Sequence, residues 1–299
     1  MDRVTNLKQA LPYIQKHRGK TFVIKLGGRV LQDRGALLRI AEDVTLLHSV
    51  GIKVVVVHGG GPQMNALAEK LGVPQQVVAG RRVTDDDTLD LAKMLFRGKL
   101  NVEIVSAFRE FGTLAVGLSG SDAGLVEATR RPVMQIQDKQ GATQEVDFGH
   151  VGDVVAINPT ILETLADSGF VPVVCSLAST PTGGVLNVNA DTIAEQISVA
   201  LGAAKLFLLT DRAGLLEDAA DPDSLISWCD AQDIEQHIAK GTIVGGMKPK
   251  VESALRALEG GVGRVHIISA FQPSSLLLEV FTNEGCGTLI VKDKCETPQ

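Results

Sequence analysis

The four cysteines of the chain show no pattern. Cys175, Cys229, Cys286 and Cys295 form no C-x-x-C pair and no Cys/His cluster with zinc spacing. The sequence therefore indicates neither a disulfide scaffold nor a structural metal site. Isolated thiols of this kind are typical of small buried residues or surface groups in a reducing cytosol. We therefore expect a cytoplasmic protein that has no metal site of its own.

Long apolar segments and an excess of basic charge are also missing. No apolar run approaches the roughly 18 residues that a membrane-spanning helix needs, and the first twenty residues lack the apolar core of a signal peptide. The net charge is −6, whereas a surface that follows nucleic-acid phosphates is rich in basic residues. The sequence predicts a soluble protein with neither a membrane nor a nucleic-acid partner.

Short β-branched runs alternate with helical stretches along most of the 299 residues. Such runs are typical of strands buried on both faces of a mainly parallel sheet. The predicted strands are Thr21–Leu26, Lys53–His58, Leu114–Leu118, Val171–Ser176, Lys205–Thr210 and Val265–Ile268. The predicted helices are Leu37–Ser49, Pro62–Leu71, Asp85–Phe111, Asp191–Leu201 and Lys250–Leu258. The pattern predicts an α/β fold, a three-layer αβα sandwich around a central, mainly parallel sheet, with ligands at the carboxyl ends of the strands.

Three segments depart from this alternation. Ala128–Asp147 is polar and indicates a hairpin or a lid, and Leu216–Ser224 is acidic and turn-rich. Near the start, Val4, Leu7, Leu11 and Ile14 have the spacing of an amphipathic helix, which Pro12 would kink or restart. Such a helix packs on its own domain or extends as an arm that docks on another subunit, and the spacing leaves both open.

Two glycine-rich turns follow predicted strands. Lys25 is followed by Leu26, Gly27 and Gly28, which lets backbone N–H groups and a lysine approach an anion together. The second turn is His58-Gly59-Gly60-Gly61-Pro62, where unpaired N–H groups at a helix start favour an anion. Three successive glycines favour function over a purely structural turn, whereas His58 itself is expected to be structural.

Two familiar nucleotide-binding motifs are absent. The P-loop pattern G-x-x-x-x-G-K-[ST] occurs nowhere, and G-x-G-x-x-G does not follow the first strand. Both absences weigh against P-loop kinases and dinucleotide-dependent dehydrogenases.

Further polar residues stand at the ends of predicted elements. Arg82, after Arg81, precedes a helix and is suited to bind a carboxylate, although a solvated surface arginine would be the better explanation if this motif stood alone. Asn187, Asn189 and Asp191 alternate along a predicted extended segment, which places them on one side of it. They indicate either a polar site or an Asx-rich turn in which Asp191 caps the helix, and Asp191 could serve both purposes. Lys250 starts a helix, where a cation is disfavoured unless an anion is also bound.

These residues include no convincing nucleophile or general base. This absence fits phosphoryl transfer to a carboxylate, because a carboxylate with a pKa of about 4 is already ionised at neutral pH. Such a catalyst has to screen two anions from each other and stabilise the charge on the transferring group.

The ordered motifs resemble those of the amino acid kinase superfamily, in its acetylglutamate kinase branch of the extended, arginine-sensitive type. They run from Leu11 to Val291 and include VIKLGG, VVVVHGGGPQ, GRRVT, GKLN, GLSGSDAG, HVGDV, NVNAD, LLTDRAGL and GGMKPKVE. The resemblance implies ATP-dependent phosphorylation of the side-chain carboxylate of N-acetyl-L-glutamate, in arginine biosynthesis, with arginine as a feedback inhibitor. It also implies Mg²⁺ that arrives with ATP.

The resemblance implies a role for each matching residue. Lys25 and Lys250 would stabilise the phosphoryl group, and Asp191 would position both lysines. The implied acceptor site comprises Gly60, Gly61, Arg82 and Asn187. The implied phosphate and ATP site comprises Gly27, Gly28, Thr210, Asp211, Gly214, Gly245, Gly246 and Met247, with Gly60 as a further phosphate donor. The implied arginine site includes Tyr13, Glu284 and Gly287.

The resemblance also implies a domain organisation and an oligomeric state, and two alternative functions remain. Residues 1–20 would form a helical arm, 21–180 an acceptor lobe and 181–299 a nucleotide lobe on one continuous sheet. The arm would link dimers into a hexamer, a trimer of dimers. Arg81 departs from the family, which has an apolar residue there. With Arg130 and Arg131 it would suit an aminoadipate-type kinase acting on an acidic carrier, and a non-catalytic arginine-sensing scaffold is a further alternative.

Overall fold

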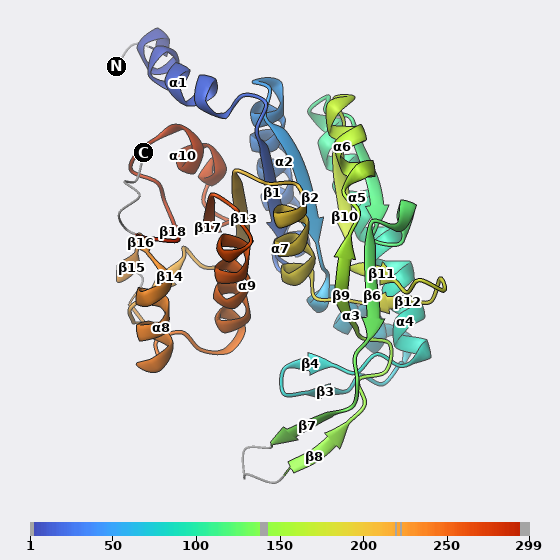
Figure 1. The fold of residues 1–299 in the computed structure, drawn as a ribbon. Coiled ribbons are helices and arrows are strands. Elements are labelled where there is room, and N and C mark those ends of the chain that lie inside the picture. The colour runs from blue at the N-terminus through green and yellow to red at the C-terminus, as the bar shows by residue number, and fades with distance from the viewer. Residues whose placement is uncertain (1–2, 138–142, 219, 222, 294–299) are drawn as a thin grey trace.

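A computed structural model describes residues 3–137, 143–218, 220–221 and 223–293. The molecule is built on an eight-stranded sheet with the strand order β16-β18-β17-β13-β1-β2-β10-β5 (Figure 1). In that order the strands are Trp228–Cys229, Thr288–Ile290, Arg264–Ser269, Lys205–Thr210, Thr21–Leu26, Lys53–His58, Val171–Cys175 and Ala115–Ser119. Within this sheet, β17 and β18 are the one antiparallel pair among the described strands, and all other pairs are parallel. The expected mainly parallel central sheet is confirmed.

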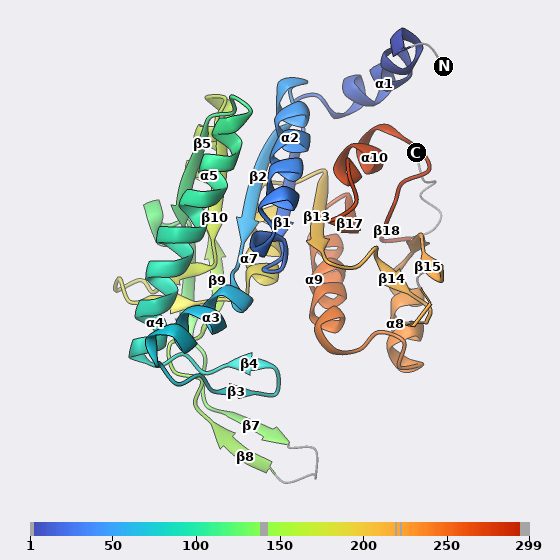
Figure 2. The same cartoon turned by 180° about the vertical axis from the view of Figure 1, so that it is seen from behind.

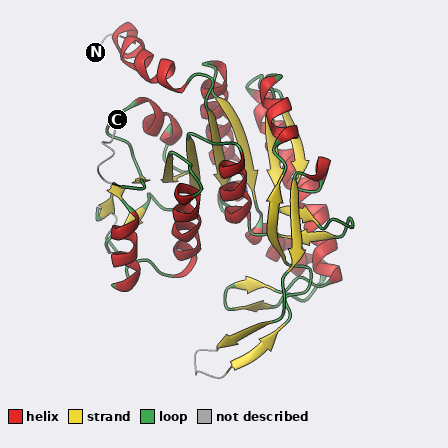
Figure 3. Cartoon of the chain, viewed as in Figure 1, coloured by secondary structure: helices red, strands yellow, loops and turns green. Residues whose placement is uncertain are grey.

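Helices cover both faces of this sheet, as Figures 2 and 3 show. The first face carries α6 (Thr160–Asp167), α7 (Ala190–Ala200), α8 (Ala231–Ala239) and α9 (Lys248–Glu259). The second carries α2 (Arg34–Ser49), α5 (Asn101–Glu110) and α10 (Ser275–Phe281). The three layers of the predicted sandwich are therefore present, and α6, α8 and α10 are helices that the sequence pattern missed.

Alternation along the strands decides which side chain faces which layer. In β1, Val23 packs under the first face, whereas Phe22 and Ile24 pack under the second. Lys25 is therefore turned towards α7 and α9. In β2, Val57 packs under the first face and Val56 under the second, so His58 is turned towards α5.

One predicted helix, Asp85–Phe111, consists of three continuous segments. These are α4 (Asp86–Ala92), the π-helix η2 (Lys93–Leu100) and α5. The preceding helix α3 (Gly61–Leu71) begins in the second glycine-rich turn and ends at Gly72 in the left-handed conformation, as expected for a helix stop. A π-helical turn carries extra backbone relative to an α-helix and is often found at functional sites.

Smaller elements lie at the carboxyl edge of the main sheet. A four-stranded sheet has the order β12-β11-β6-β9, with strands Val185–Asn187, Leu177–Ser179, Val126–Arg130 and Gly152–Ile157. Three hairpins are β3–β4 (Val77–Val78, Arg81–Arg82), β7–β8 (Met134–Gln137, Thr143–Val146) and β14–β15 (Leu215–Leu216, Leu225–Ile226). Short helical turns are η1 (Val30–Gln32), η3 (Asp122–Gly124) and η4 (Gly245–Met247).

The expectation for Ala128–Asp147 holds only in part. Its middle forms the β7–β8 hairpin, of which residues 138–142 lie outside the described residues. Its start belongs to β6, where Ala128 is fully buried in the core. The prediction was wrong there because the polar neighbours of Ala128 hide a strand that buries only alternate residues. The acidic stretch Leu216–Ser224 connects β14 to β15.

The N-terminal helix α1 (Arg3–His17) stands off from the sheet and reaches the rest of the chain near α10 (Figure 1). One helix runs through Pro12 without restarting. Leu11 is 50% exposed, whereas Tyr13 donates a hydrogen bond of 2.6 Å to Asn283 Oδ1. In the described ranges, no helix is both long enough and apolar enough to cross a bilayer.

Asp43 on α2 is a buried carboxylate that makes stability depend on pH. Burial, followed by the charge of Glu42, raises the pKa of Asp43 to about 6. The folded state then binds more protons than the unfolded state between about pH 4 and 6, so stability is lost as pH rises through this window. Charging Asp43 costs about 1–2 kcal/mol after screening by solvent.

We expect Asp43→Asn to raise Tm at pH 8 by about 2–6 °C. Thermal unfolding of both proteins at pH 4 is the internal control, because Asp43 is then protonated and the difference should vanish. Equal Tm values at pH 8 would contradict the prediction.

Candidate active site

The site is centred on Asp191, which lies between two lysines from different parts of the chain. Lys25 Nζ at the end of β1 is 2.7 Å from Asp191 Oδ1, and Lys250 Nζ on α9 is 2.9 Å from Oδ2. The side chains of Lys25 and Asp191 are each only 8% exposed. The structure thus brings together the three residues predicted to be catalytic.

The cluster contains two ammonium groups and one carboxylate, so its positive charge exceeds its negative charge. Burial alone would raise the pKa of Asp191, but the two ammonium groups outweigh it and hold the pKa well below its usual range. Burial, then the like charge of Lys250, lowers the pKa of Lys25, although Asp191 opposes the shift. One buried carboxylate facing two cations, Lys25 buried and Lys250 partly exposed, favours the arrival of a further anion.

The cap of α7 leaves Asp191 free for this task. Asn189, not Asp191, caps the helix, because its side chain accepts a hydrogen bond of 2.8 Å from the Asp191 N–H. The alternative in which Asp191 is the cap is therefore wrong. Asp191 lies in the first turn of α7, where the helix dipole stabilises its charge.

The first two glycine-rich turns lie against each other. A Cβ added to Gly28 would lie 2.5 Å from Pro62 Cδ, and Gln63 Nε2 donates a hydrogen bond of 2.7 Å to the Gly28 carbonyl. A Cβ on Gly27 would lie 2.9 Å from the Leu209 carbonyl oxygen. This close packing requires glycine at both positions.

The second turn is shaped by the π-helix. A Cβ on Gly60 would lie 2.4 Å from Leu100 Cδ1 and 2.9 Å from Phe96 Cε1, whereas one on Gly61 would meet nothing within 4 Å. In the part of the chain that the structure describes, no side chain caps α3 at Gly60. The turn therefore offers backbone N–H groups to a ligand.

A cavity of about 320 Å³ contains the predicted acceptor residues Arg82 and Asn187. Asn187 Nδ2 donates to Thr84 Oγ1 at 3.1 Å. Arg82 is half-buried, donates to Gln75 and Asn65, and lies 3.4 Å from the Gly61 carbonyl oxygen. Gly60 and Gly61 do not line this cavity, but Arg82 connects it to their turn.

The other arginines near this cavity already have partners. Arg131 forms an ion pair with Asp153 at 2.5 Å, and Arg130 forms one with Asp147 at 2.8 Å. Arg81 contacts Met134 Sδ at 3.7 Å. The two ion pairs neutralise much of the basic surface that an acidic carrier protein would need.

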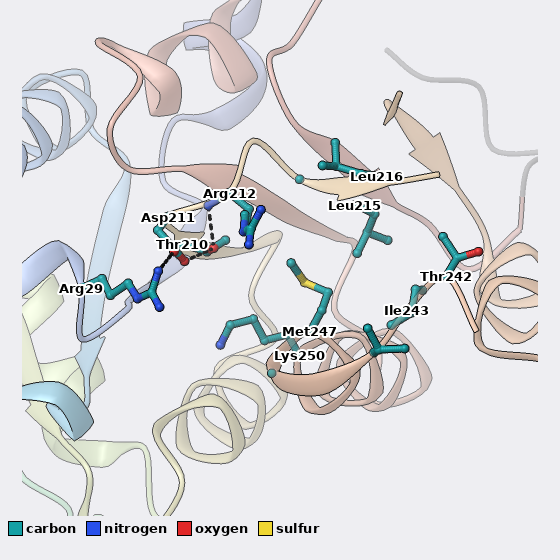
Figure 4. A pocket seen from close by; sticks show the side chains of 13 residues that line it. Arg29, Thr210, Asp211, Arg212, Leu215, Leu216, Thr242, Ile243, Met247 and Lys250 are labelled. Atoms are coloured by element: carbon teal, nitrogen blue, oxygen red, sulfur yellow. Dashed lines mark hydrogen bonds and ion pairs between the residues drawn. The ribbon is translucent and has the colours of Figure 1, made fainter. Parts of the chain in front are cut away.

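A second cavity, of about 430 Å³, lies between the end of β13 and the start of α9 (Figure 4). Predicted nucleotide residues line it, namely Thr210, Asp211, Gly214, Gly246 and Met247, together with Lys250. Gly245 is in the same loop, with φ +58°, but does not line the cavity. Arg29 and Arg212 are further lining residues that the sequence did not single out, and Arg29 pairs with Asp211.

A third cavity, of about 260 Å³, lies between α1 and the C-terminal part of the chain. The predicted residues Tyr13, Glu284 and Gly287 all line it. So do four residues that the sequence did not single out: His17, Lys205, His266 and Glu279.

Three of these residues, Lys205, His266 and Glu279, form a buried polar chain. Lys205 Nζ lies 3.2 Å from His266 Nε2, and His266 Nδ1 lies 2.8 Å from Glu279 Oε2. Burial would raise the pKa of Glu279, but His266 and the N–H groups of Cys286 and Gly287 lower it to about 2. Glu279 therefore remains a carboxylate in this cavity. A charged residue inside an apolar strand or helix, such as Glu279 in LLLEVF, is the signal that could have revealed it.

Comparison with known proteins agrees with this geometry. The amino acid kinase family model matches residues 20–269. The chain is 47% identical to the acetylglutamate kinase of Desulfitobacterium hafniense over 97% of both chains. It is 46% identical to that of Methanocaldococcus jannaschii, over 98% of this chain and 97% of the relative.

Solved structures give the same fold. N-acetylglutamate synthase from Neisseria gonorrhoeae, complexed with coenzyme A and N-acetyl-glutamate, superposes with a TM-score of 0.80 at 29% identity. The match covers 98% of this chain and 64% of the synthase. Carbamate kinase from Giardia lamblia shares the fold with a TM-score of 0.64 at 19% identity, over 92% of this chain and 99% of the other. The chain belongs to the amino acid kinase family.

Proposed function

We infer that this chain transfers the γ-phosphate of ATP to the side-chain carboxylate of N-acetyl-L-glutamate, forming an acyl phosphate in arginine biosynthesis. The observation that carries this inference is Asp191 held between Lys25 and Lys250. The near full-length relatives named acetylglutamate kinase supply the identity of the acceptor.

The mechanism needs no general base, because the acceptor carboxylate is ionised at neutral pH. Lys25 and Lys250 act as cations on the transferring phosphoryl group, and Asp191 fixes their positions. The N–H groups of Gly28 and Gly60 donate to phosphate oxygens as charge develops on them. The N–H of Gly27 already donates to the Leu209 carbonyl oxygen at 3.1 Å, so the expected role of Gly27 as a phosphate donor is not supported. Each of these roles stabilises charge and none moves a proton.

Substrate binding is divided between two cavities. Gly60, Gly61, Arg82 and Asn187 hold the acceptor, with Arg82 as a bidentate partner of its second carboxylate. Thr210, Asp211, Gly214, Gly245, Gly246 and Met247 hold the nucleotide. The acceptor residues Gly60, Gly61 and Arg82 belong to a lobe of residues 21–180, whereas Asn187 and these nucleotide residues belong to the lobe of residues 181–299.

Mg²⁺ enters with the ATP phosphates, where it neutralises charge. The residues fit this route, because Asp191 is engaged by two lysines and Asp211 by Arg29. In the described residues no three His, Cys, Asp or Glu side chains gather as a metal site. The reaction takes place in the cytoplasm.

We expect hydroxylamine trapping of the acyl phosphate to give product with N-acetyl-L-glutamate and ATP. Glutamate and aminoadipate are the competing acceptors, and both should react at least tenfold more slowly at equal concentration. Wild-type protein that forms no hydroxamate with acetylglutamate would overturn the proposed function. A preference for carrier-linked aminoadipate would favour the rival kinase, although the ion pairs of Arg130 and Arg131 do not support it. A scaffold without activity is not favoured either, because all three catalytic residues are in place.

We further propose that arginine binds the third cavity and inhibits, and that α1 joins dimers into a hexamer. Tyr13 and His17 belong to α1 and also line the cavity, so the arm and the effector site share a wall. The exposed Leu11 is available for a second subunit.

Removal of residues 1–18 should convert hexamers to dimers and weaken arginine binding at least tenfold. Sedimentation velocity measures the first effect. Fluorescence of Trp228, the only tryptophan in the chain and part of the cavity wall, measures the second. Leu11→Ser is the matched variant, which should weaken assembly but leave the cavity wall intact. A truncated protein that still sediments as a hexamer would refute the role of the arm.

A further inference from the structure

His58 and Asn101 form a buried polar contact beneath the second glycine-rich turn. His58 is fully buried at the end of β2, and Asn101, the first residue of α5, is 1% exposed. Asn101 Nδ2 lies 3.1 Å from His58 Nε2, and His58 Nδ1 lies 3.0 Å from the Gly59 carbonyl oxygen. None of the roles given above uses either side chain.

The partners of Asn101 fix the orientation of its amide. Nδ2 lies 2.9 Å from the Val173 carbonyl oxygen, which only accepts, and Oδ1 lies 3.3 Å from Arg97 Nη1, which only donates. Nδ2 also lies 3.4 Å from the Leu118 carbonyl oxygen, which is the longest of its three contacts. We therefore assign the two hydrogens of Nδ2 to the shorter contacts, with the Val173 carbonyl oxygen and with His58 Nε2.

This orientation fixes the tautomer of His58. Because Nε2 accepts from Asn101, the proton of the neutral ring is on Nδ1, and Nδ1 donates to the Gly59 carbonyl oxygen. Burial lowers the pKa of His58 to about 4, so the ring stays neutral at physiological pH.

The bond to Gly59 in turn orients the next N–H group. The Gly59–Gly60 peptide is planar and trans, so its C=O and N–H point in opposite directions. With the carbonyl turned towards the buried ring, the Gly60 N–H is turned away from it, to the open side of the turn. Leu100 and Phe96 of the π-helix close the space behind Gly60.

We propose that Asn101 and His58 are positioning residues, which hold the Gly59–Gly60 peptide so that the Gly60 N–H faces the reacting anion. This rests on the proposal that Gly60 binds that anion. Neither residue touches the substrate. Asn101 sets the tautomer of His58, and His58 sets the direction of the peptide.

The test compares two neutral replacements of His58. In His58→Asn the side-chain amide nitrogen takes the place of Nδ1 and still donates to Gly59, whereas in His58→Gln it takes the place of Nε2 and does not. We expect His58→Gln to lower kcat roughly 10- to 100-fold with little change in the KM for ATP, and His58→Asn to recover most of this loss. Equal kcat values for the two variants, each corrected for folded fraction, would overturn the proposal.

A second pair of variants tests the role of Asn101 through substitutions at two glycines, Gly117 and Gly98. A Cβ on Gly117 would lie 1.8 Å from Asn101 Oδ1, whereas one on Gly98, an exposed residue of the π-helix, meets nothing within 4 Å. Gly117→Ala should reproduce the kcat defect of His58→Gln, and Gly98→Ala should keep wild-type kcat. A wild-type kcat in a folded Gly117→Ala protein would also overturn the proposal.

Arg82→Gln in the same assay separates this proposal from the acceptor site. An unchanged KM for acetylglutamate in Arg82→Gln would contradict the acceptor assignment. The comparison of His58→Asn with His58→Gln would still test the orientation of the Gly59–Gly60 peptide. It compares kcat at saturating substrate, which does not depend on whether Arg82 binds the acceptor.

Discussion

Asp191→Asn should lower kcat by about 10³-fold while leaving the KM for ATP unchanged or lower. The substitution keeps the shape of the side chain but removes the negative charge between Lys25 and Lys250, which lie 2.7 and 2.9 Å from it. The two lysines then repel each other and lose the group that fixes their positions, so the transition state loses most of its preorganised cations. The unpaired lysines still attract phosphates, so nucleotide binding should persist. Steady-state kinetics with varied ATP measures both constants.

The same substitution should destabilise the free protein by about 3 kcal/mol, because it leaves buried cations without their counter-charge. Asp167→Asn is the matched control. It makes the same chemical change in an ion pair with Lys53, where the Asp167 side chain is 61% exposed, and should shift stability by less than about 1 kcal/mol. ATP should raise the Tm of Asp191→Asn more than that of the wild type, since phosphate replaces the missing charge. A kcat within tenfold of wild type would contradict the role given to Asp191.

The second large effect is expected from Gly60→Ala. The added methyl group would lie 2.4 Å from Leu100 Cδ1 and 2.9 Å from Phe96 Cε1, and overpacking of this kind costs about 1–3 kcal/mol. The turn has to move to relieve the clash, which displaces the Gly60 N–H from the anion. We expect kcat/KM for acetylglutamate to fall more than about 100-fold, together with a lower Tm.

Gly61→Ala, at the neighbouring residue, is the control that distinguishes a packing clash from an effect on acceptor binding. Its methyl group meets no protein atom within 4 Å, so Tm should stay at the wild-type value. Any loss of activity in this variant then reports on the space that the acceptor occupies. If Gly60→Ala and Gly61→Ala had the same Tm, the clash with the π-helix would not limit this turn.

Much of the fold was predictable because burial on both faces imposes unbroken β-branched runs. The six predicted strands, such as Thr21–Leu26 and Lys53–His58, correspond to strands of the main sheet. The four-stranded sheet was missed because its strands are only partly buried. Val185–Asn187 buries only Leu186, and Gly152–Ile157 buries only Gly152. Helix α10 was missed because LLLEVF is too short to show a helical period.

The sequence singled out residues that stand in contiguous motifs, and it missed residues that only the tertiary structure brings together. Lys25, Asp191 and Lys250 each stand beside a glycine or an asparagine turn and could be identified individually. Lys205, His266 and Glu279 are single polar residues within apolar segments, and only the tertiary structure brings them into one cavity. Asn101 illustrates the same limit, because its partners His58 and Val173 are 43 and 72 residues away. The roles assigned to the site residues, and the boundaries of the two lobes, stay predictions for the experiments above.

The π-helix also constrains how long the chain can be at this point. Each residue of an α-helix turns the following side chains by about 100°. Deletion of one residue between Lys93 and Leu100 would therefore rotate Asn101 away from His58, unless a π-helical turn, which holds an extra residue, became α-helical. An insertion would rotate it the other way. A change of one residue in length here therefore affects the glycine turn through Asn101 and through Leu100 and Phe96, although the segment lines neither cavity that holds a substrate.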